Sequence, residues 1–177
     1  MPEHGDRSAP ELDIQLLTAP SLDLEPLTVE HADELHRLLD DPALHTFTGG
    51  QPADVHELRA RYARQVLGRS PDGSQRWLNW VVRDRDTGRA VGTVQATVTT
   101  ADGRRTAEVA WVVARPHQRR GYAREAARTM AAWLRAHGVQ ELVAHVHPDH
   151  TASAAVARTL GLGPTGTVVD GEVRWTG

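Results

Sequence analysis

Cysteine and lysine are both absent from the sequence, and long apolar runs are absent too. Without cysteine, the chain has no disulfide framework, no thiolate metal site and no cysteine nucleophile. No apolar stretch approaches the roughly 18 residues that cross a bilayer, and the polar first residues, 1–6, lack the pattern of a signal peptide. We therefore expect a cytoplasmic protein that has no membrane partner.

Neither sign of charge is in large excess, because 23 acidic and 20 basic residues leave a net charge of only −3. No global field attracts nucleic acid, so we expect no nucleic-acid partner. Every basic residue is an arginine, which is typical of a coding bias. An arginine in this chain is therefore not, by itself, an indication of phosphate recognition.

The 177 residues, of which 40% are hydrophobic, suffice for a globular domain with a core of its own. The first residues are polar and contain proline. We expect a loose N-terminal tail over residues 1–12, followed by a single domain over residues 13–177.

Apolar and β-branched residues predict three consecutive strands in the middle of the chain, over residues 77–83, 90–100 and 106–114. Asp102 and Gly103 form a strong hairpin signal between the second and the third strand. We expect these strands to form an antiparallel meander.

A helical stripe begins at Ala123 and ends at Gly138, and a short strand over residues 141–146 follows it. Strand, helix and strand in this order form a crossover unit, whose two strands are parallel neighbours. The predicted fold class is therefore α/β or α+β, with a mixed, mostly antiparallel central sheet and helices on both faces. The other expected elements are a strand over residues 22–27, helices over residues 29–40, 55–66 and 150–160, and a last strand or hairpin over residues 168–175.

Residues 115–123 join the third strand of the meander to the long helix. The first N–H groups of a helix lack intrahelical partners and lie at the positive end of its dipole, so such a junction can bind an anion. Gly121 permits close approach of the backbone to a ligand, and Arg119 and Arg120 add positive charge. We interpret the junction as a phosphate-binding loop; the alternative is an ordinary basic loop that ends at a small residue.

The pattern Gln118-x-x-Gly121-x-Ala123 resembles the Gln/Arg-x-x-Gly-x-Gly/Ala signature of the GNAT superfamily of N-acetyltransferases. Residues 107–113, 150–153 and 160–162 are similar to the branch that includes the RimJ and RimL ribosomal-protein N-terminal acetyltransferases. The resemblance extends from about residue 22 to the end of the chain. It implies an acyltransferase that uses acetyl-CoA as acetyl donor and needs no metal.

The resemblance also implies direct transfer in a ternary complex, in which an amine attacks the acetyl thioester without an acyl-enzyme. The strand that ends at Val113 is expected to splay from its neighbour, pair with the pantetheine arm and donate an N–H to the oxyanion. The residues thereby expected to bind the coenzyme are Trp111, Val112, Val113, Gln118, Arg119, Arg120, Gly121, Tyr122, Ala123, His150 and Ser153.

Two side chains are candidates for the proton transfers. Glu108, where the resemblance places an acidic residue, is the expected general base, acting through a water; the alternative is a surface glutamate. Many family members carry a tyrosine that protonates the thiolate, at the position of Ala157 here, and Ser153 is the candidate that this chain offers instead. Ser153 either bonds to the coenzyme or caps its helix, and the role of His150, where asparagine is usual, stays open.

The resemblance places the acceptor between the first two helices and the last hairpin. That position nominates Phe47, the exposed side of Trp77 and Trp80, and Trp175 as substrate-binding residues. The sequence leaves the acceptor open between a protein N-terminus and a small-molecule amine, and the assembly open between a monomer and a homodimer.

Two alternatives to an acetyltransferase remain. His145, His147, Asp149 and His150 spell H-x-H-x-D-H, the ligand pattern of metallo-β-lactamase-like zinc hydrolases. Such enzymes take further ligands downstream, and no histidine follows His150, so this alternative is remote. A non-catalytic acyl-CoA-binding module would keep the phosphate-binding loop and lack the proton-transfer residues.

Overall fold

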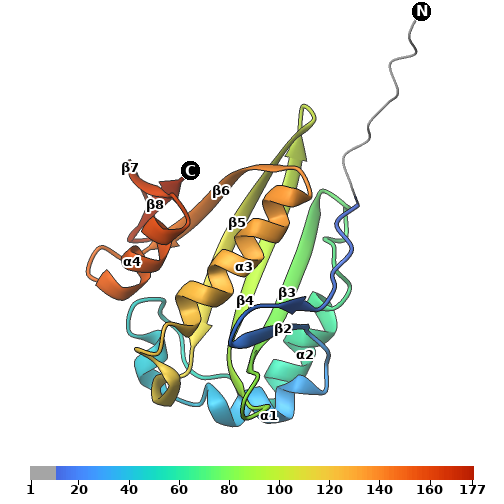
Figure 1. The fold of residues 1–177 in the computed structure, drawn as a ribbon, viewed down its shortest axis with the longest axis vertical. Helices are drawn as coiled ribbons and strands as arrows, with labels where there is room; N and C mark the ends of the chain where they lie inside the picture. The colour runs from blue at the N-terminus through green and yellow to red at the C-terminus, as the bar shows by residue number, and fades with distance from the viewer. Residues whose placement is uncertain (1–10) are drawn as a thin grey trace, which may run out of the picture.

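The computed structural model describes residues 11–177, and these residues form one sheet in the strand order β1-β2-β3-β4-β5-β6-β8-β7 (Figure 1). The strands are β1 Leu17–Thr18, β2 Leu22–Pro26, β3 Gln75–Asp84, β4 Ala90–Ala101, β5 Arg104–Val113, β6 Val139–Val146, β7 Gly163–Val169 and β8 Glu172–Thr176. The helices are α1 His31–Leu38, α2 Val55–Gln65, α3 Tyr122–Ala136 and α4 Thr151–Thr159, with the 3-10 turns η1 Pro42–His45 and η2 Arg115–His117.

Most of the sheet is antiparallel, and the parallel pair is β5 with β6. The predicted meander, β3 to β5, and the crossover from β5 through α3 to β6 are both present. The predicted fold class is therefore confirmed.

Helices cover both faces of the sheet, and the side chains of β3 alternate between the two cores that result. Trp80 and Val82 point into the main core, where α3 contributes Met130 and Leu134. Val81 points to the opposite face, into a smaller core with residues of α1 and α2 such as Leu35. In Figure 1, α3 crosses the near face of the sheet and α2 lies behind the strands. The smaller core therefore positions α1 and α2 over one face of the sheet.

The expected tail, residues 1–12, falls mostly on residues 1–10, which lie outside the described residues. Leu12 is 4% exposed and belongs to the main core. From residue 11 to residue 177, no helix is long and apolar enough to cross a membrane.

Candidate functional site

Strands β5 and β6 are paired along only part of their length. Their ladder ends at Glu108 and Val143, although β5 continues to Val113 and β6 to Val146. Beyond that point β6 is paired on its other edge with β8. An opening therefore separates residues 109–113 from residues 144–146, and we call it the β5–β6 gap.

The backbone of β5 presents hydrogen-bond donors to this gap. The N–H of Ala114 donates to the carbonyl of Val91 at 2.9 Å, on the β4 side. Because successive residues of a strand present their N–H groups to opposite edges, the N–H groups of Val113 and Trp111 face the gap. The side-chain amide of Gln118 donates to the Val113 carbonyl at 3.0 Å, which fastens the following loop to the end of β5.

Helix α3 begins beside the end of β5 with an uncapped first turn. Gly121 is its N-cap, at φ 81°, and no side chain caps the helix. The carbonyl of Gly121 accepts from the N–H of Glu125 at 3.0 Å, whereas the N–H groups of Tyr122, Ala123 and Arg124 have no acceptor within the described residues. These donors lie at the positive end of the helix dipole, where they are able to bind an anion.

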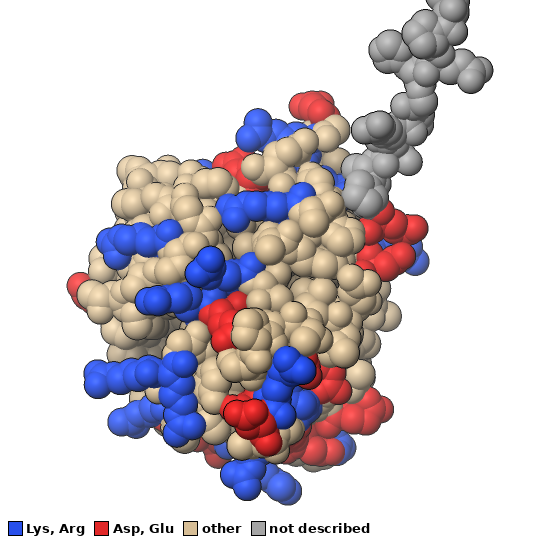
Figure 2. Space-filling view, viewed as in Figure 1, with Lys and Arg blue, Asp and Glu red and all other residues tan. Residues whose placement is uncertain are grey.

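The loop before α3 is strongly basic and sharply bent. Arg119 has a φ of 62°, so two left-handed residues, Arg119 and Gly121, turn the chain into the helix. Arg119 and Arg120 are exposed. Figure 2 shows arginine side chains gathered at the lower left of the molecule, where this loop lies. The charge of the loop and the open helix start therefore favour the same kind of ligand, an anion.

Tyr122 anchors the start of α3 rather than facing the anion site. Its hydroxyl donates to Oδ2 of Asp84, at the end of β3. The other oxygen of Asp84 accepts from the N–H groups of Asp86 and Thr87, each at 2.9 Å. The hydrogen bond to Asp84 raises the pKa of Tyr122, so the phenol stays protonated as the donor.

On the far side of the gap, His150 caps α4. Its Nδ1 accepts from the N–H of Ser153 at 3.2 Å, and its Nε2 lies 3.3 Å from the Ser153 hydroxyl. Burial lowers the pKa of His150, which favours the neutral imidazole that can accept. The centroid of the Phe47 ring lies 4.4 Å from that of the His150 ring and 5.2 Å from that of the His147 ring. The segment between η1 and α2 therefore contacts the junction of β6 and α4.

Glu108 lies where the gap begins. Its neighbours Ala107 and Val109 point into the main core, so Glu108 points to the face that α1 and α2 cover. Its Oε1 lies 3.4 Å from Nδ1 of His145 on β6; the Glu108 side chain is 62% exposed and that of His145 21%. A carboxylate and an imidazole thus share this face at the mouth of the gap.

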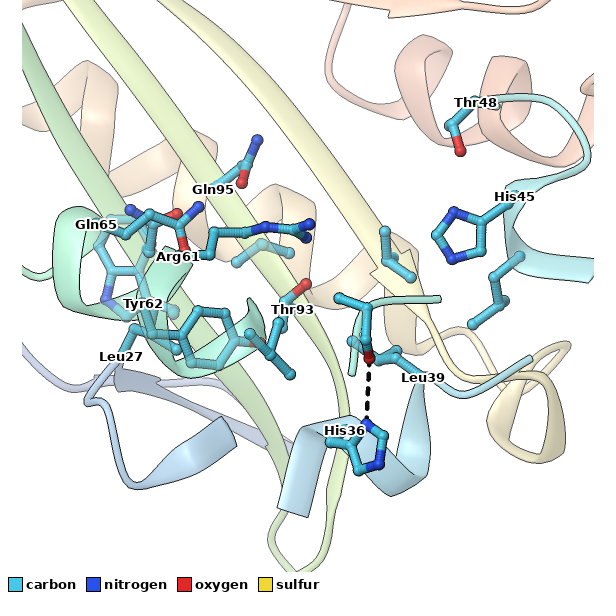
Figure 3. Close-up of a pocket in the computed structure, with 17 residues that line it drawn as sticks. Leu27, His36, Leu39, His45, Thr48, Arg61, Tyr62, Gln65, Thr93 and Gln95 are labelled. Carbon is cyan, nitrogen blue, oxygen red and sulfur yellow. Dashed lines mark hydrogen bonds between the residues drawn. The ribbon is translucent and has the colours of Figure 1, made fainter. Parts of the chain in front are cut away.

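A cavity of about 210 Å³ lies on the same face, between α1, η1, α2 and strands β3 to β5. We call it the α1–α2 cavity (Figure 3). Val112, beside the gap, forms part of its wall, so the cavity and the gap meet at β5. Its other apolar lining residues include Leu39, Leu44 and Leu58, and its polar ones are His36, His45, Thr48, Arg61, Tyr62, Gln65, Asn79, Thr93 and Gln95.

A family profile described as an acetyltransferase (GNAT) domain matches residues 21–163. The chain belongs to the GNAT family. It is an acyltransferase. No curated protein sequence matches it.

Solved structures of GNAT proteins share the fold at low sequence identity. RimL, a ribosomal L7/L12 alpha-N-protein acetyltransferase in complex with coenzyme A, is 17% identical with a TM-score of 0.75, over 92% of this chain and 97% of that one. A GNAT-family acetyltransferase from Bacillus anthracis is 16% identical with a TM-score of 0.73, over 92% and 97%. Spermidine N-acetyltransferase from Vibrio cholerae, in complex with CoA and spermine, is 18% identical with a TM-score of 0.72, over 88% and 94%.

The GNAT signature segment and the β5 edge lie side by side in the structure. Gln118 to Ala123 surround the open start of α3, and residues 111–113 follow one edge of the gap. Ser153 and His150 lie on the other side, at the start of α4. His150 rather than Ser153 is the N-cap of α4.

Two aromatic residues nominated for the acceptor require correction. Trp80 has no exposed side, because its ring is fully buried, 5.7 Å from Trp133, and its Nε1 donates to the carbonyl of Gln15 at 2.9 Å. Trp175 is 5% exposed, belongs to the main core and lies under Arg158. Strand alternation directs both rings to the face opposite the α1–α2 cavity, although Trp80 is itself among the residues that border the cavity.

Trp77 and Phe47 are partly exposed, and neither lines the cavity. Trp77 lies on the cavity face, in a row across the sheet with Thr97 and Glu108. It is therefore close to the mouth of the gap, whereas Phe47 contacts the rings at the β6–α4 junction.

The sequence interpretation missed most of the polar cavity wall. Thr93 and Gln95 alternate along β4 with the core residues Val94 and Ala96, and this pattern was the signal that could have identified them. His145 was considered only as a metal ligand, although its place on β6 puts it on the same face as Glu108. The alternation did not indicate that α1 and α2 cover this face of the sheet and enclose a cavity there.

The histidine-rich motif does not form a ligand set. His145 faces Glu108, His147 lies 3.9 Å from Asp149, and His150 caps α4. In the described part of the chain, no group of three or more His, Cys, Asp or Glu side chains could hold a metal ion. This geometry gives the zinc-hydrolase alternative no support.

Proposed function

We propose that this GNAT protein is an acetyl-CoA-dependent N-acetyltransferase of the RimJ/RimL-like branch, which transfers acetyl directly to a primary amine. The observation that carries the proposal is the β5–β6 gap beside the uncapped start of α3. The gap supplies strand N–H donors for an amide-containing arm, and the start of α3 supplies donors for a pyrophosphate. A long ligand that has both groups fits the two features together.

The coenzyme is held by backbone more than by side chains. Its pyrophosphate is bound by the free N–H groups at the start of α3, with Arg119 and Arg120 adding charge. The pantetheine arm follows residues 111–113 in the gap, opposite His150 and Ser153. The reactive thioester is thereby brought to the wall that the gap shares with the α1–α2 cavity.

The reaction forms one C–N bond and breaks one C–S bond. The acceptor nitrogen attacks the acetyl carbonyl, and an N–H of β5 that faces the gap donates to the developing oxyanion; one such donor contributes roughly 3 kcal/mol in other enzymes. Glu108 takes the amine proton through a water, with His145 beside it. As the C–S bond breaks, coenzyme A departs from the acetyl carbon as its thiolate, which takes a proton from solvent or from Ser153.

The acceptor's own pKa sets how much a base contributes. Deprotonating an α-amino group of pKa near 8 costs only about 1 kcal/mol at neutral pH, whereas an alkylamine of pKa near 10.4 costs about 4–5 kcal/mol. Glu108 therefore matters most for basic amines. A non-catalytic acyl-CoA-binding module would have no use for this Glu108–His145 pair at the gap.

The test separates binding from transfer with two variants. We expect the wild type to bind acetyl-CoA and to acetylate a primary amine from a panel of amines and peptides. Gly121→Glu places a carboxylate at the helix start and raises the Kd for acetyl-CoA roughly tenfold or more. Glu108→Gln keeps that Kd and lowers kcat by about 10²-fold.

Gly103→Glu is the matched control for the Gly121 variant. Gly103 has a φ of 72° and Gly121 one of 81°, and an added Cβ meets nothing within 4 Å at either position. Strain and added charge are thus equal, but Gly103 lies in the β4–β5 hairpin. Acetyl-CoA binding without turnover of any amine would leave the binding module as the function, and an absence of binding would refute both.

A further inference from the structure

Among the described residues, the lining of the α1–α2 cavity contains basic side chains and no carboxylate. His36, His45 and Arg61 line it, and no aspartate or glutamate within residues 11–177 does. The remaining wall is apolar or neutral and polar. Burial raises the pKa of Tyr62 to about 12, so its phenol carries no negative charge at neutral pH. The cavity therefore offers nothing to balance an acceptor with several positive charges.

Arg61 is the permanently charged residue of this lining, and it has no anionic partner among the described residues. The neighbouring acids are occupied: Asp33 binds Arg59 at 2.7 Å, and Glu34 binds Arg83 at 3.2 Å. Asp54 and Glu57 form the capping box at the start of α2. The guanidinium of Arg61 is thus free to bind a ligand.

Arg61 is exposed to solvent and lines the cavity, so a ligand bound in the cavity can reach its guanidinium. Arg61 extends from α2 across the strands, toward the side chains of Gln95 and Thr93 (Figure 3). Gln65, one turn further along α2, also lines the cavity. A planar guanidinium beside amide and hydroxyl donors is the arrangement that binds a carboxylate or a phosphate.

The opposite charge lies at the gap. Glu108 is in the row of the sheet formed with Thr97 and Trp77, and the next row toward the cavity contains Gln95. Consecutive rows on one face are about 7 Å apart along a strand. A negative side chain at the gap and a positive one over the cavity together complement a ligand with an ammonium end and an anionic end.

We infer that the acceptor of this enzyme is a small amine that carries a carboxylate or phosphate group, which Arg61 binds in the α1–α2 cavity. This inference rests on the proposed acetyl transfer. It disfavours polyamines and aminoglycosides, whose further ammonium groups would lie against Arg61 without a counter-charge.

Three amines of matched length test the inference. δ-Aminovalerate, aminopentanol and cadaverine share a five-carbon chain and end in a carboxylate, a hydroxyl and an ammonium group. We expect the wild type to show a kcat/KM for δ-aminovalerate that is about tenfold or more above that for cadaverine. The phosphate ester of aminopentanol forms a further arm, which decides between carboxylate and phosphate.

Arg61→Gln supplies the decisive comparison. It should lower kcat/KM for the anionic amine by roughly 10- to 100-fold and change that for aminopentanol by no more than about twofold. Arg64→Gln is the control, because Arg64 is exposed on the same helix and does not line the cavity. It should leave the order of the acceptors unchanged, and neither variant should alter the Kd for acetyl-CoA.

Several results would overturn the inference. One is that cadaverine has the highest kcat/KM of the amines in the wild type, and another is that a peptide N-terminus without a neighbouring acidic side chain has it. A third is that Arg61→Gln leaves the order of the acceptors unchanged. If acetyl-CoA binds and no amine is acetylated, the proposed function fails by itself. Calorimetric binding of the same three amines to the coenzyme-bound protein then decides the Arg61 inference, because tighter binding of δ-aminovalerate that Arg61→Gln abolishes would still support it.

Discussion

His150 occupies the position where the family pattern has asparagine, and it caps a helix there. Its Nδ1 accepts the N–H of Ser153, as an asparagine oxygen would. Unlike asparagine, an imidazole loses this acceptor when it is protonated. The substitution therefore makes the start of α4 sensitive to pH.

The sign of this effect follows from the lowered pKa of His150, which burial causes relative to an ordinary value of 6.5. The unfolded chain binds the proton more readily, so stability is fully present above about pH 6.5 and is lost as pH falls through the folded pKa. We expect His150→Asn to lose less unfolding free energy than the wild type between about pH 8 and pH 5. Urea unfolding at the two pH values measures this.

His117→Asn serves as the control, since the His117 side chain has no hydrogen bond or ion pair within the described residues. It should retain the pH dependence of the wild type. The same dependence in His150→Asn would mean that the cap does not titrate as we describe.

At the scale of elements, the start of α3 is fixed from outside the helix. Gly121 offers no capping side chain, and the hydroxyl of Tyr122 holds the first turn to Asp84 on β3. The hydrogen bond between Tyr122 and Asp84 therefore positions α3, while the first N–H groups of the helix stay available for a ligand.

Tyr122→Phe removes that anchor and leaves the anion-binding N–H groups in place. We expect the Kd for acetyl-CoA to rise by roughly three- to tenfold, as the loss of one charge-assisted hydrogen bond allows. Isothermal titration calorimetry measures it. Tyr62→Phe, on α2, removes the same hydroxyl from the other face of the sheet and should leave the Kd unchanged; equal effects in both variants would contradict an anchoring role.

The sequence predicted the elements whose periodicity is strong. The stripe of α3 and the parallel pairing of β5 with β6 were both predicted, because the 3.6-residue period and the crossover rule act locally. Strand β1, of two residues, depends on its pairing with β2, and the start of β7 at Gly163 carries no alternation. Neither had a signal of its own.

Site residues followed a similar division. The loop that we propose to bind phosphate had a signal in the sequence, because its glycine and its place before a helix are features of the chain itself. The orientation of Trp80 had no such signal, because β3 carries apolar residues on both faces, Trp80 and Val82 on one and Val81 on the other. The cavity wall, which α2 and β4 form together, exists only through tertiary packing.

At the scale of the whole molecule, the two faces of the sheet have separate tasks. The main core supports α3 and, through it, the anion site. The smaller core joins α1 and α2 to the sheet, and its members Leu58 and Tyr62 line the α1–α2 cavity, which Trp80 and Val94 of the main core also border. Damage to one core should therefore affect one substrate more than the other.

Leu35→Ala and Met130→Ala test this division with residues that are both fully buried, Leu35 in the smaller core and Met130 in the main one. Each should lower the unfolding free energy by about 2–5 kcal/mol. Only Leu35→Ala should also raise KM for the acceptor, with the Kd for acetyl-CoA unchanged. Steady-state kinetics below the unfolding transition checks this, and a matching rise in Met130→Ala would argue against separate tasks.

The early end of the β5–β6 ladder leaves an edge strand in the middle of a sheet. Exposed edges invite pairing with other chains, and the proposed coenzyme would complete this one as a surrogate strand. The free energy of unfolding then depends on the concentration of the coenzyme, because a ligand at 100 times its Kd adds about 2.7 kcal/mol of stability. Cells rich in acetyl-CoA would thus hold the enzyme in its most durable form.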